Sequence, residues 1–328
     1  MAGGARAGQA RAHGRHAGHG HEVLRRQERV AAGNGEVAAV DGVDLDVATG
    51  EIFALLGPNG AGKTTTVEIL EGHRTRTAGE VTVLGVDPER ADASWRARVG
   101  IVLQAGGRFD ELTVGELVAH FAGFYPRALP VDDVLELVGL ADRHDARTGR
   151  LSGGQRRRLD LALGLVGDPE LVFLDEPTTG FDPASRRAAW RVVGDLRSLG
   201  KTVLLTTHYL DEAEHLADRV GIMARGRLVE VGTPSALGGR ATAEATVRFR
   251  AEGPLAGAAL PRLPALDVQR ADGTVSVRTT TPTAVVGALG AWASAAGVEE
   301  LPELCVLRPT LEDVYLRLVG ADVEAAPA

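Results

Sequence analysis

The chain has 328 residues, of which 44% are hydrophobic and 24% charged, and its formal net charge is −8. This composition is typical of a globular protein with room for two domains, and the negative charge excludes nucleic acid as the default partner. No stretch approaches the roughly eighteen consecutive apolar residues of a membrane-spanning helix, so we expect no membrane span. The single cysteine, Cys305, excludes an internal disulfide and fits a reducing compartment.

The first 30 residues are rich in Gly, Ala, Arg and His and lack the apolar segment of a secretory signal. Histidines in this stretch could bind a metal loosely, but no other residue there could organise a site. We therefore expect a disordered tail over residues 1–30. The histidines are His13, His16, His19 and His21.

Short apolar runs alternate with helical patterns over residues 31–237. An alternation of apolar and acidic residues over 43–47 predicts a half-buried strand. Continuous apolar runs predict strands that are buried on both faces, in chain order over 51–57, 98–104, 170–176, 201–208 and 219–226. Buried strands that alternate with helices indicate an α/β domain with a largely parallel sheet.

The alternation stops over about residues 105–160. Thr113 and Glu116 have the spacing of a capping box, and apolar residues follow them at helical spacing. A further helix is predicted over 131–140. We interpret this stretch as an α-helical insert in the α/β domain.

The composition changes after residue 240. The runs 245–253 and 273–281 alternate as strands do, and 283–297 predicts a helix. A last helix begins with a capping box at Thr310 and carries an apolar face from Leu311 to Val319. These patterns predict a small α+β domain over 241–320, followed by a frayed tail over 321–328. The apolar face of the last helix either closes the core of this small domain or contributes to a dimer.

The segment GPNGAGKTTT follows a buried strand and opens a helix, which is the context of a phosphate-binding P-loop. Its glycines let backbone N–H groups turn toward phosphates, and the helix N-terminus favours negative charge. Lys63 would contact the terminal phosphates, and the Thr64 hydroxyl would ligate Mg²⁺. The expected phosphate-binding residues are Gly57, Pro58, Asn59, Gly60, Ala61, Gly62, Lys63, Thr64 and Thr65.

Other predicted strands also end in polar residues, and α/β sheets bind ligands at the carboxyl ends of their strands. Asp175 would hold Mg²⁺ together with Thr64 and Gln104. Glu176, beside Asp175, would polarise an attacking water. Gln104 and His208 complete the expected catalytic set, with His208 near the γ-phosphate.

The segment LSGGQ, from Leu151 to Gln155, is a second phosphate-binding pattern. Ser152 is expected to cap a helix, and the amides of Gly153 and Gly154 would point at a phosphate. One nucleotide does not require two such patterns, which raises the question of what the second one binds.

The P-loop, Gln104, LSGGQ, LVFLDE, TGFD and His208, in this order, resemble the ATP-binding subunit of ABC transporters over about residues 36–235. LSGGQ is the signature motif of that family. The resemblance implies a P-loop NTPase fold and two nucleotide-binding domains packed head to tail. The signature, Leu151, Ser152, Gly153, Gly154 and Gln155, would then cover the ATP of the partner, and Asp182 would lie at the dimer seam. Because the chain has one set of motifs, we expect a homodimer or a dimer with a related subunit.

Longer segments, such as LTVGELVAHFAGFYP, resemble the drug-resistance branch, the daunorubicin and polyketide-antibiotic exporters. The resemblance implies ATP and Mg²⁺ as cofactors, a separate transmembrane permease, and a cytoplasmic protein bound peripherally at the inner face of the cell membrane. The implied cargo is an antibiotic or another hydrophobic compound. The alternative is a soluble ABC-type ATPase or an ATP-gated switch that is not coupled to transport.

Members of this family stack an aromatic residue on adenine shortly before the segment that corresponds to residues 39–42. The alignment places Asn34 there, and Asn34 and Val40 are the residues expected near adenine. Stacking of a base on an aromatic ring is worth ~1–3 kcal/mol. Either the stack is lost, which predicts weaker nucleotide binding, or another residue supplies it.

Overall fold

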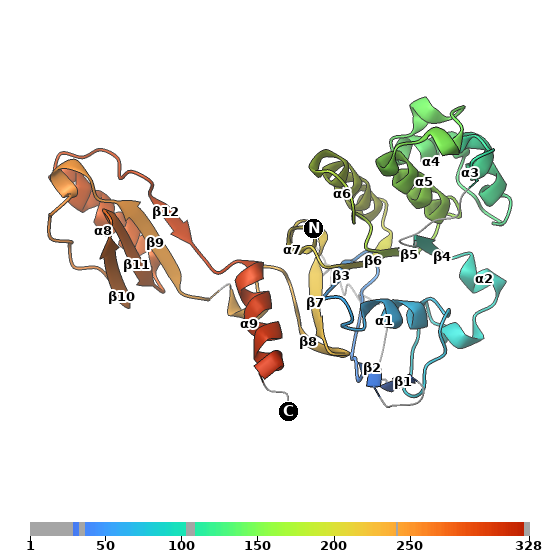
Figure 1. Ribbon diagram of the computed structural model, residues 1–328, viewed down its shortest axis with the longest axis horizontal. Helices are drawn as coiled ribbons and strands as arrows, with labels where there is room; N and C mark the ends of the chain where they lie inside the picture. The colour runs from blue at the N-terminus through green and yellow to red at the C-terminus, as the bar shows by residue number, and fades with distance from the viewer. Residues whose placement is uncertain (1–28, 33–36, 103–108, 241, 325–328) are drawn as a thin grey trace, which may run out of the picture.

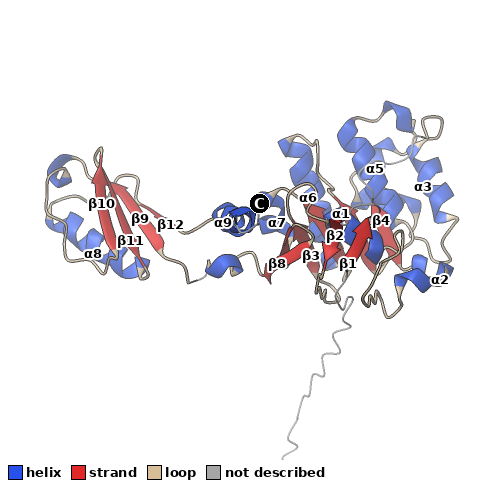
Figure 2. Cartoon of the chain, turned by 60° about the horizontal axis from the view of Figure 1, so that its bottom comes forward, coloured by secondary structure: helices blue, strands red, loops and turns tan. Residues whose placement is uncertain are grey.

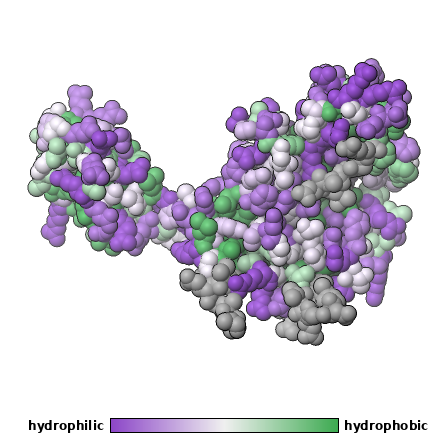
Figure 3. All heavy atoms as spheres, viewed as in Figure 1, coloured by the Kyte–Doolittle hydropathy of each residue, from purple (hydrophilic) through white to green (hydrophobic). Residues whose placement is uncertain are grey.

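The structure is a computed structural model, and it describes residues 29–32, 37–102, 109–240 and 242–324. The chain folds into an α/β domain and a smaller domain that lies apart from it (Figure 1). The space-filling view shows a narrow connection between the two domains (Figure 3). Among the described residues, no helix has the length and the apolar character needed to cross a membrane.

The α/β domain is built on a six-stranded sheet in the order β4-β5-β6-β3-β7-β8. All neighbouring strands in it are parallel except β7 and β8, which form an antiparallel pair at one edge. Five of the strands confirm the predicted buried runs, and β8 was not predicted. Their bounds are β3 Ile52–Leu56, β4 Val99–Val102, β5 Leu171–Asp175, β6 Thr202–Thr207, β7 Arg219–Ala224 and β8 Arg227–Gly232.

The inner strands are largely apolar and buried, since both faces of the sheet are covered. In β3, Ile52 and Ala54 belong to one hydrophobic cluster, and Phe53 and Leu55 belong to another on the opposite face. One face is covered by α6 Pro183–Ser198, α7 Leu210–Leu216 and the helical insert. The other face is covered by α1 Lys63–Leu70 and the segment that follows β2. Strands that are buried on both faces are typical of the centre of a parallel sheet.

The segment 43–47 is not a strand, so that prediction was wrong. Val43, Leu45 and Val47 are buried while the acidic residues between them are exposed, as the alternation suggested, but the segment joins no strand pair. Its apolar side chains pack on the face of the sheet. Before it, β1 Arg29–Ala32 and β2 Val37–Asp41 form a separate antiparallel pair.

The helical insert contains α3 Val114–Ala122, α4 Val131–Leu137 and the start of α5 Gly153–Leu165. Thr113 caps α3 in the predicted capping box with Glu116. The far end of α5 contacts β4 and so joins the insert to the sheet. Shorter helices are α2 Ala93–Arg96 and the 3₁₀ turns Pro88–Arg90, Ala141–Arg143, Thr148–Arg150, Leu237–Gly239 and Gly253–Leu255.

The small domain is an antiparallel sheet in the order β10-β11-β9-β12, with α8 Pro282–Ala295 on one face (Figure 2). Residues such as Phe249 on the sheet and Leu289 on α8 form its separate core. β9 and β11 fall on the predicted runs, whereas β10 and β12 were not predicted. The strands are β9 Ala245–Arg250, β10 Asp267–Ala271, β11 Thr274–Thr279 and β12 Cys305–Leu307.

The last helix, α9 Leu311–Glu324, packs on the α/β domain and not on the small sheet (Figure 1). It contacts α7 and β7, and Leu311 and Val314 are buried in the hydrophobic cluster of the α/β domain. The interpretation that this apolar face closes the core of the small domain is therefore wrong. The expected frayed tail over 321–328 is corrected for residues 321–324, which continue the helix, while residues 325–328 lie outside the described residues.

Candidate functional site

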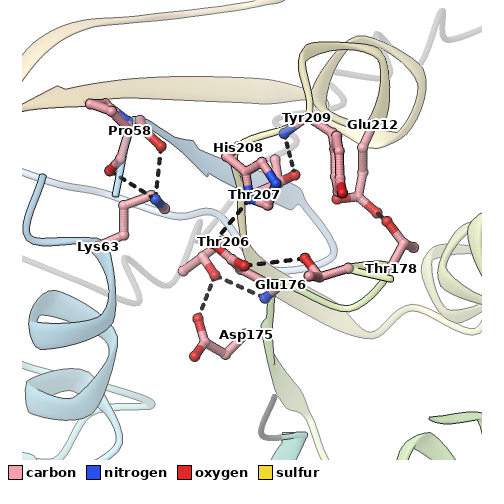
Figure 4. A network of polar contacts seen from close by, with 12 residues as sticks. Pro58, Lys63, Asp175, Glu176, Thr178, Thr206, Thr207, His208, Tyr209 and Glu212 are labelled. Carbon is pink, nitrogen blue, oxygen red and sulfur yellow. Dashed lines mark hydrogen bonds and ion pairs between the residues drawn. The ribbon is translucent and has the colours of Figure 1, made fainter. Parts of the chain in front are cut away.

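The P-loop, the acidic pair and His208 meet where the central strands of the large sheet end, a region called the catalytic edge below. Leu56 pairs with Thr207, and Asp175 pairs with Thr206, so β3, β5 and β6 end side by side. This register brings the P-loop, Asp175, Glu176 and His208 together, as the strand-end argument predicted (Figure 4).

The P-loop has two positions at which only glycine fits. A Cβ at Gly57 would lie 2.5 Å from the Met223 carbonyl oxygen, and one at Gly62 would lie 2.5 Å from the Ala39 carbonyl oxygen. Gly62 also has a φ of +100° at the N-cap of α1, in the left-handed region that favours glycine. The loop thus turns sharply from β3 into α1, and its backbone N–H groups gather at the start of the helix.

The Lys63 ammonium is held against the P-loop backbone. Its Nζ donates hydrogen bonds to the carbonyl oxygens of Gly57, at 2.7 Å, and Pro58, at 3.2 Å, and the residue is only 5% exposed. Burial lowers the pKa of Lys63, and the nearby charges of Glu176 and Asp175 act in the opposite direction. Thr64 is exposed and Thr65 half-buried, so both hydroxyls lie within reach of a ligand at the loop.

The Thr206 hydroxyl orients both acidic residues. It donates to Asp175 Oδ1 at 2.6 Å and accepts from the Glu176 backbone N–H at 3.0 Å. The backbone of Glu176 has a φ of +46°, an uncommon conformation for a residue with a long side chain. Backbone strain of this kind concentrates at functional sites, where contacts with the surrounding residues maintain the strained conformation.

The Glu176 carboxylate is fixed by two further contacts. Its Oε1 lies 3.1 Å from His208 Nδ1, and its Oε2 accepts from the Thr179 hydroxyl at 3.1 Å. Because a carboxylate only accepts, Nδ1 is the ring nitrogen of His208 that carries a proton here. The Glu176 side chain is 15% exposed, so it is accessible to a small molecule such as water.

The oxygen ligands that Mg²⁺ prefers are present at this edge. Asp175 supplies a carboxylate and Thr64 an exposed hydroxyl, while Gln104 lies outside the described residues. No group of three or more His, Cys, Asp and Glu suited to a metal occurs in the described part of the chain. One carboxylate and one hydroxyl fit Mg²⁺, which proteins often hold by few side chains together with substrate phosphates.

The structure does not support the expectation that Asn34 and Val40 lie near adenine. Asn34 lies outside the described residues. Val40 is 2% exposed and packs in the hydrophobic cluster below the P-loop, so its side chain offers no surface to a base. The prediction that Val40 contacts adenine was wrong for this reason.

The signature forms the exposed start of α5. The Ser152 hydroxyl accepts from the Gln155 N–H at 3.2 Å, and the Ser152 N–H donates to Gln155 Oε1 at 3.0 Å. Leu151 anchors the turn in the core, whereas Ser152 and Gly153 are exposed. A Cβ added at Gly153 would meet no neighbouring atom of the described residues within 4 Å, so no contact in that part of the chain requires glycine there.

Asp182 caps α6 at the end of the turn that follows Glu176. Its carboxylate accepts from the backbone N–H groups of Ala184 and Ser185, at 2.9 and 3.0 Å, and from the Ser185 hydroxyl. A Cβ at Gly154 would lie 3.1 Å from that hydroxyl oxygen, so the starts of α5 and α6 are close neighbours. The expected seam residue therefore lies next to the signature.

Arg157 is a site residue that the sequence did not reveal. From the buried side of α5, its guanidinium donates to the carbonyl oxygens of Asp175, Glu176 and Pro177, at 3.0, 3.4 and 3.3 Å. Burial lowers the pKa of Arg157. The motif QRRR contains three adjacent arginines, and no local pattern distinguishes the one that turns inward. Arg157 links the signature helix to the catalytic turn.

Comparisons with known proteins identify the family. A family model described as "ABC transporter" matches residues 40–179, and one described as "ABC transporter domain-containing protein-like, C-terminal domain" matches residues 245–310. A daunorubicin resistance ATP-binding protein, DrrA3 of Streptomyces coeruleorubidus, is 40% identical over 302 residues, which cover 88% of this chain and 93% of that protein.

Further similar proteins include the Nod factor export ATP-binding protein I of Rhizobium meliloti, 38% identical over 296 residues, which cover 88% of this chain and 86% of that protein. Among solved structures, cbiO1 of Clostridium perfringens, part of the ABC transporter complex cbiONQ, superposes with a TM-score of 0.58 at 26% identity. That match covers 65% of this chain and 89% of the other. The motifs, the fold and these relatives agree: the chain belongs to the ATP-binding proteins of ABC transporters, which bind and hydrolyse ATP.

Proposed function

We propose that the chain energises a membrane exporter as a dimer that encloses two ATP molecules. The observation that carries the proposal is the presence, in one chain, of an assembled catalytic edge and of a separate, exposed signature turn. At the catalytic edge, hydrogen bonds join Asp175, Glu176 and His208 through Thr206, and Lys63 is held by the carbonyl oxygens of the neighbouring P-loop. Two features of the signature suit phosphate binding. The capping box fixes the start of α5, and the described residues leave the space beside Gly153 free for a ligand.

At the catalytic edge, the P-loop amides and Lys63 bind the phosphates of ATP. Glu176 accepts a proton from the water that attacks the γ-phosphorus, and the bond to the β-γ bridging oxygen breaks. His208 and Thr179 keep the Glu176 carboxylate in place, because each contacts one of its oxygens. Thr64 and Asp175, with Gln104, would hold Mg²⁺, which neutralises phosphate charge when it is bound. The close contact between Glu176 and His208 favours hydrolysis over a switch that only binds ATP.

The signature binds the γ-phosphate of the partner's ATP. A glycine at the start of an exposed helix is less favourable than alanine by up to ~1 kcal/mol. No contact among the residues that the structure describes explains Gly153, whereas the close approach of a partner's nucleotide would explain it. In this dimer Asp182, beside the signature helix, lies at the seam.

The permease binds at the helical insert. A groove of about 380 Å³ lies between the end of α1 and the insert, and its walls include Trp95, Phe121 and Tyr125. Beside it, Phe124 is 69% exposed and packs edge-on against Phe121. Exposed aromatic surface of this kind marks protein interfaces. The chain then lies at the inner face of the cell membrane, and the names of the relatives suggest an antibiotic or another hydrophobic cargo.

The dimer is tested by light scattering on Glu176→Gln protein, with and without Mg-ATP. Glutamine removes the base, so hydrolysis stops while the enclosed ATP keeps the dimer closed. We expect a monomer without nucleotide and a dimer of twice the mass with Mg-ATP. The matched control adds Lys63→Ala, which should stay monomeric. A Glu176→Gln protein that remains a monomer at millimolar Mg-ATP would contradict the homodimer.

A further inference from the structure

A buried glutamate follows His208 by four residues. Glu212 lies in α7, is 0% exposed, and its Oε1 accepts two hydrogen bonds. The donors are the Thr178 hydroxyl at 2.8 Å and the Trp190 Nε1 at 3.1 Å. Figure 4 shows Thr178 and Glu212 directed toward each other, beside Glu176 and His208. The catalytic steps described above do not use this carboxyl.

The two donors lie before and after Asp182 in the sequence. Thr178 follows Glu176 by two residues, in the part of the loop that leaves the sheet. Trp190 lies in α6, the helix that Asp182 caps. One oxygen of Glu212 therefore holds both sides of the loop that reaches the proposed dimer seam.

Packing between α6 and α7 keeps this arrangement in place. The Arg186 guanidinium carbon lies 5.3 Å from the centroid of the Trp190 ring and 5.5 Å from that of Tyr209, and Arg186 forms a 2.8 Å ion pair with Asp211. The Tyr209 ring in turn lies 4.1 Å from the His208 ring, between centroids. His208 is therefore connected to α7 both through the backbone and through the contacts of Tyr209, Arg186 and Asp211.

A carboxyl at this position is costly, because burial penalises its charge and raises its pKa. An aliphatic residue would fill the same space without that cost. Only a side chain with an acceptor oxygen can hold Thr178 and Trp190 together. The presence of a glutamate at this position is therefore explained by its hydrogen bonds and not by its packing.

We propose that Glu212 is a positioning residue for ATP hydrolysis, because it ties the helix after His208 to both sides of the loop that carries Asp182. The inference rests on the proposed roles of His208 and Asp182. Through Glu212, the position of His208 at one nucleotide is coupled to the seam residue that faces the partner.

Steady-state ATPase kinetics of Glu212→Ala, Glu212→Gln and Thr178→Val test the proposal. Glu212→Ala should lower kcat about tenfold or more while KM for ATP changes less than about threefold, because the P-loop is untouched. Glu212→Gln should retain kcat within about threefold, since an amide oxygen can accept both bonds. Thr178→Val should lower kcat, and adding it to Glu212→Ala should cause little further loss.

The structural control is Val193→Ala in α6, a buried residue outside the hydrogen bonds of Glu212. It should lower the melting temperature and leave kcat unchanged. The proposal is overturned if Glu212→Gln is as impaired as Glu212→Ala, if the losses at Thr178 and Glu212 multiply, or if Glu212→Ala keeps the wild-type kcat. If Glu212→Ala does not fold, the contrast between Thr178→Val and Glu212→Gln decides. Failure of the function itself would appear differently, as unchanged ATP turnover in Lys63→Ala.

Discussion

Glu71 should make the stability of this protein depend on pH. It caps the C-terminus of α1, its side chain is 2% exposed, and its Oε2 lies 3.2 Å from His73 Nδ1. Burial, together with the nearby charges of Asp175 and Glu68, raises the pKa of Glu71 to about 8. The neutral carboxyl is thus the stable form in the folded protein at neutral pH.

The direction in which the free energy of unfolding changes with pH follows from proton binding. Between the ordinary pKa of 4.5 and the folded pKa of about 8, the unfolded chain releases the Glu71 proton while the folded chain keeps it. The free energy of unfolding therefore falls as pH rises through this range. One pKa unit corresponds to ~1.36 kcal/mol, so the full loss above pH 8 is on the order of 2–5 kcal/mol.

Urea unfolding of Glu71→Gln and of the wild type, at pH 5 and at pH 8.5, measures this effect. Glutamine keeps the shape but does not ionise, so the two proteins should be equally stable within about 1 kcal/mol at pH 5. At pH 8.5 the variant should be more stable by on the order of 2–5 kcal/mol. In an Asp175→Asn background the difference at pH 8.5 should shrink, because a charge that opposes ionisation of Glu71 is gone. A destabilised Glu71→Gln at both pH values would refute the reasoning, since Glu71 would then be a stabilising anion.

Three further substitutions have defined outcomes. Lys63→Ala should abolish ATP turnover in a phosphate-release assay, and retained turnover would remove the P-loop assignment. Gly62→Ala should abolish nucleotide binding in calorimetry, because its Cβ would meet the Ala39 carbonyl oxygen at 2.5 Å; wild-type affinity would contradict this geometry. Arg240→Ala should speed amide exchange in α9, because Arg240 donates to the Pro309 carbonyl and to Glu214 on α7. Unchanged exchange would show that apolar packing alone holds α9.

The catalytic edge could be predicted because its signals are local. The runs over 170–176 and 201–208 end in polar residues, and the run over 51–57 leads into the P-loop. Parallel strands align their carboxyl ends, so the sequence predicts that Lys63, Asp175 and Glu176 lie together. The residues that orient them could not be found in this way. Thr206 acts on Asp175 from 31 positions away, and Arg157 acts on it from 18. Contacts of this kind depend on how the elements pack, and no local pattern encodes them.

The errors have a common physical origin. A pattern of apolar residues states that a face is buried, but not which surface buries it. The alternation over 43–47 reflects packing on the sheet and not strand pairing. The apolar face of α9 is buried as expected, yet against α7 and β7. Val40 was placed by an alignment with the family, while its burial is set by the cluster around the P-loop.

Because α9 returns to the large sheet, the chain divides into domains differently from its order in the sequence. The main chain leaves the α/β domain near residue 240 and comes back at Pro309, and a hydrogen bond of 2.9 Å from Arg240 joins the two crossing points. The small domain is thus an insertion within a discontinuous domain. Replacing residues 241–308 by a short linker would remove a complete folding unit. Ending the chain at residue 240 would instead strip Leu311 and Val314 from the core of the ATPase itself.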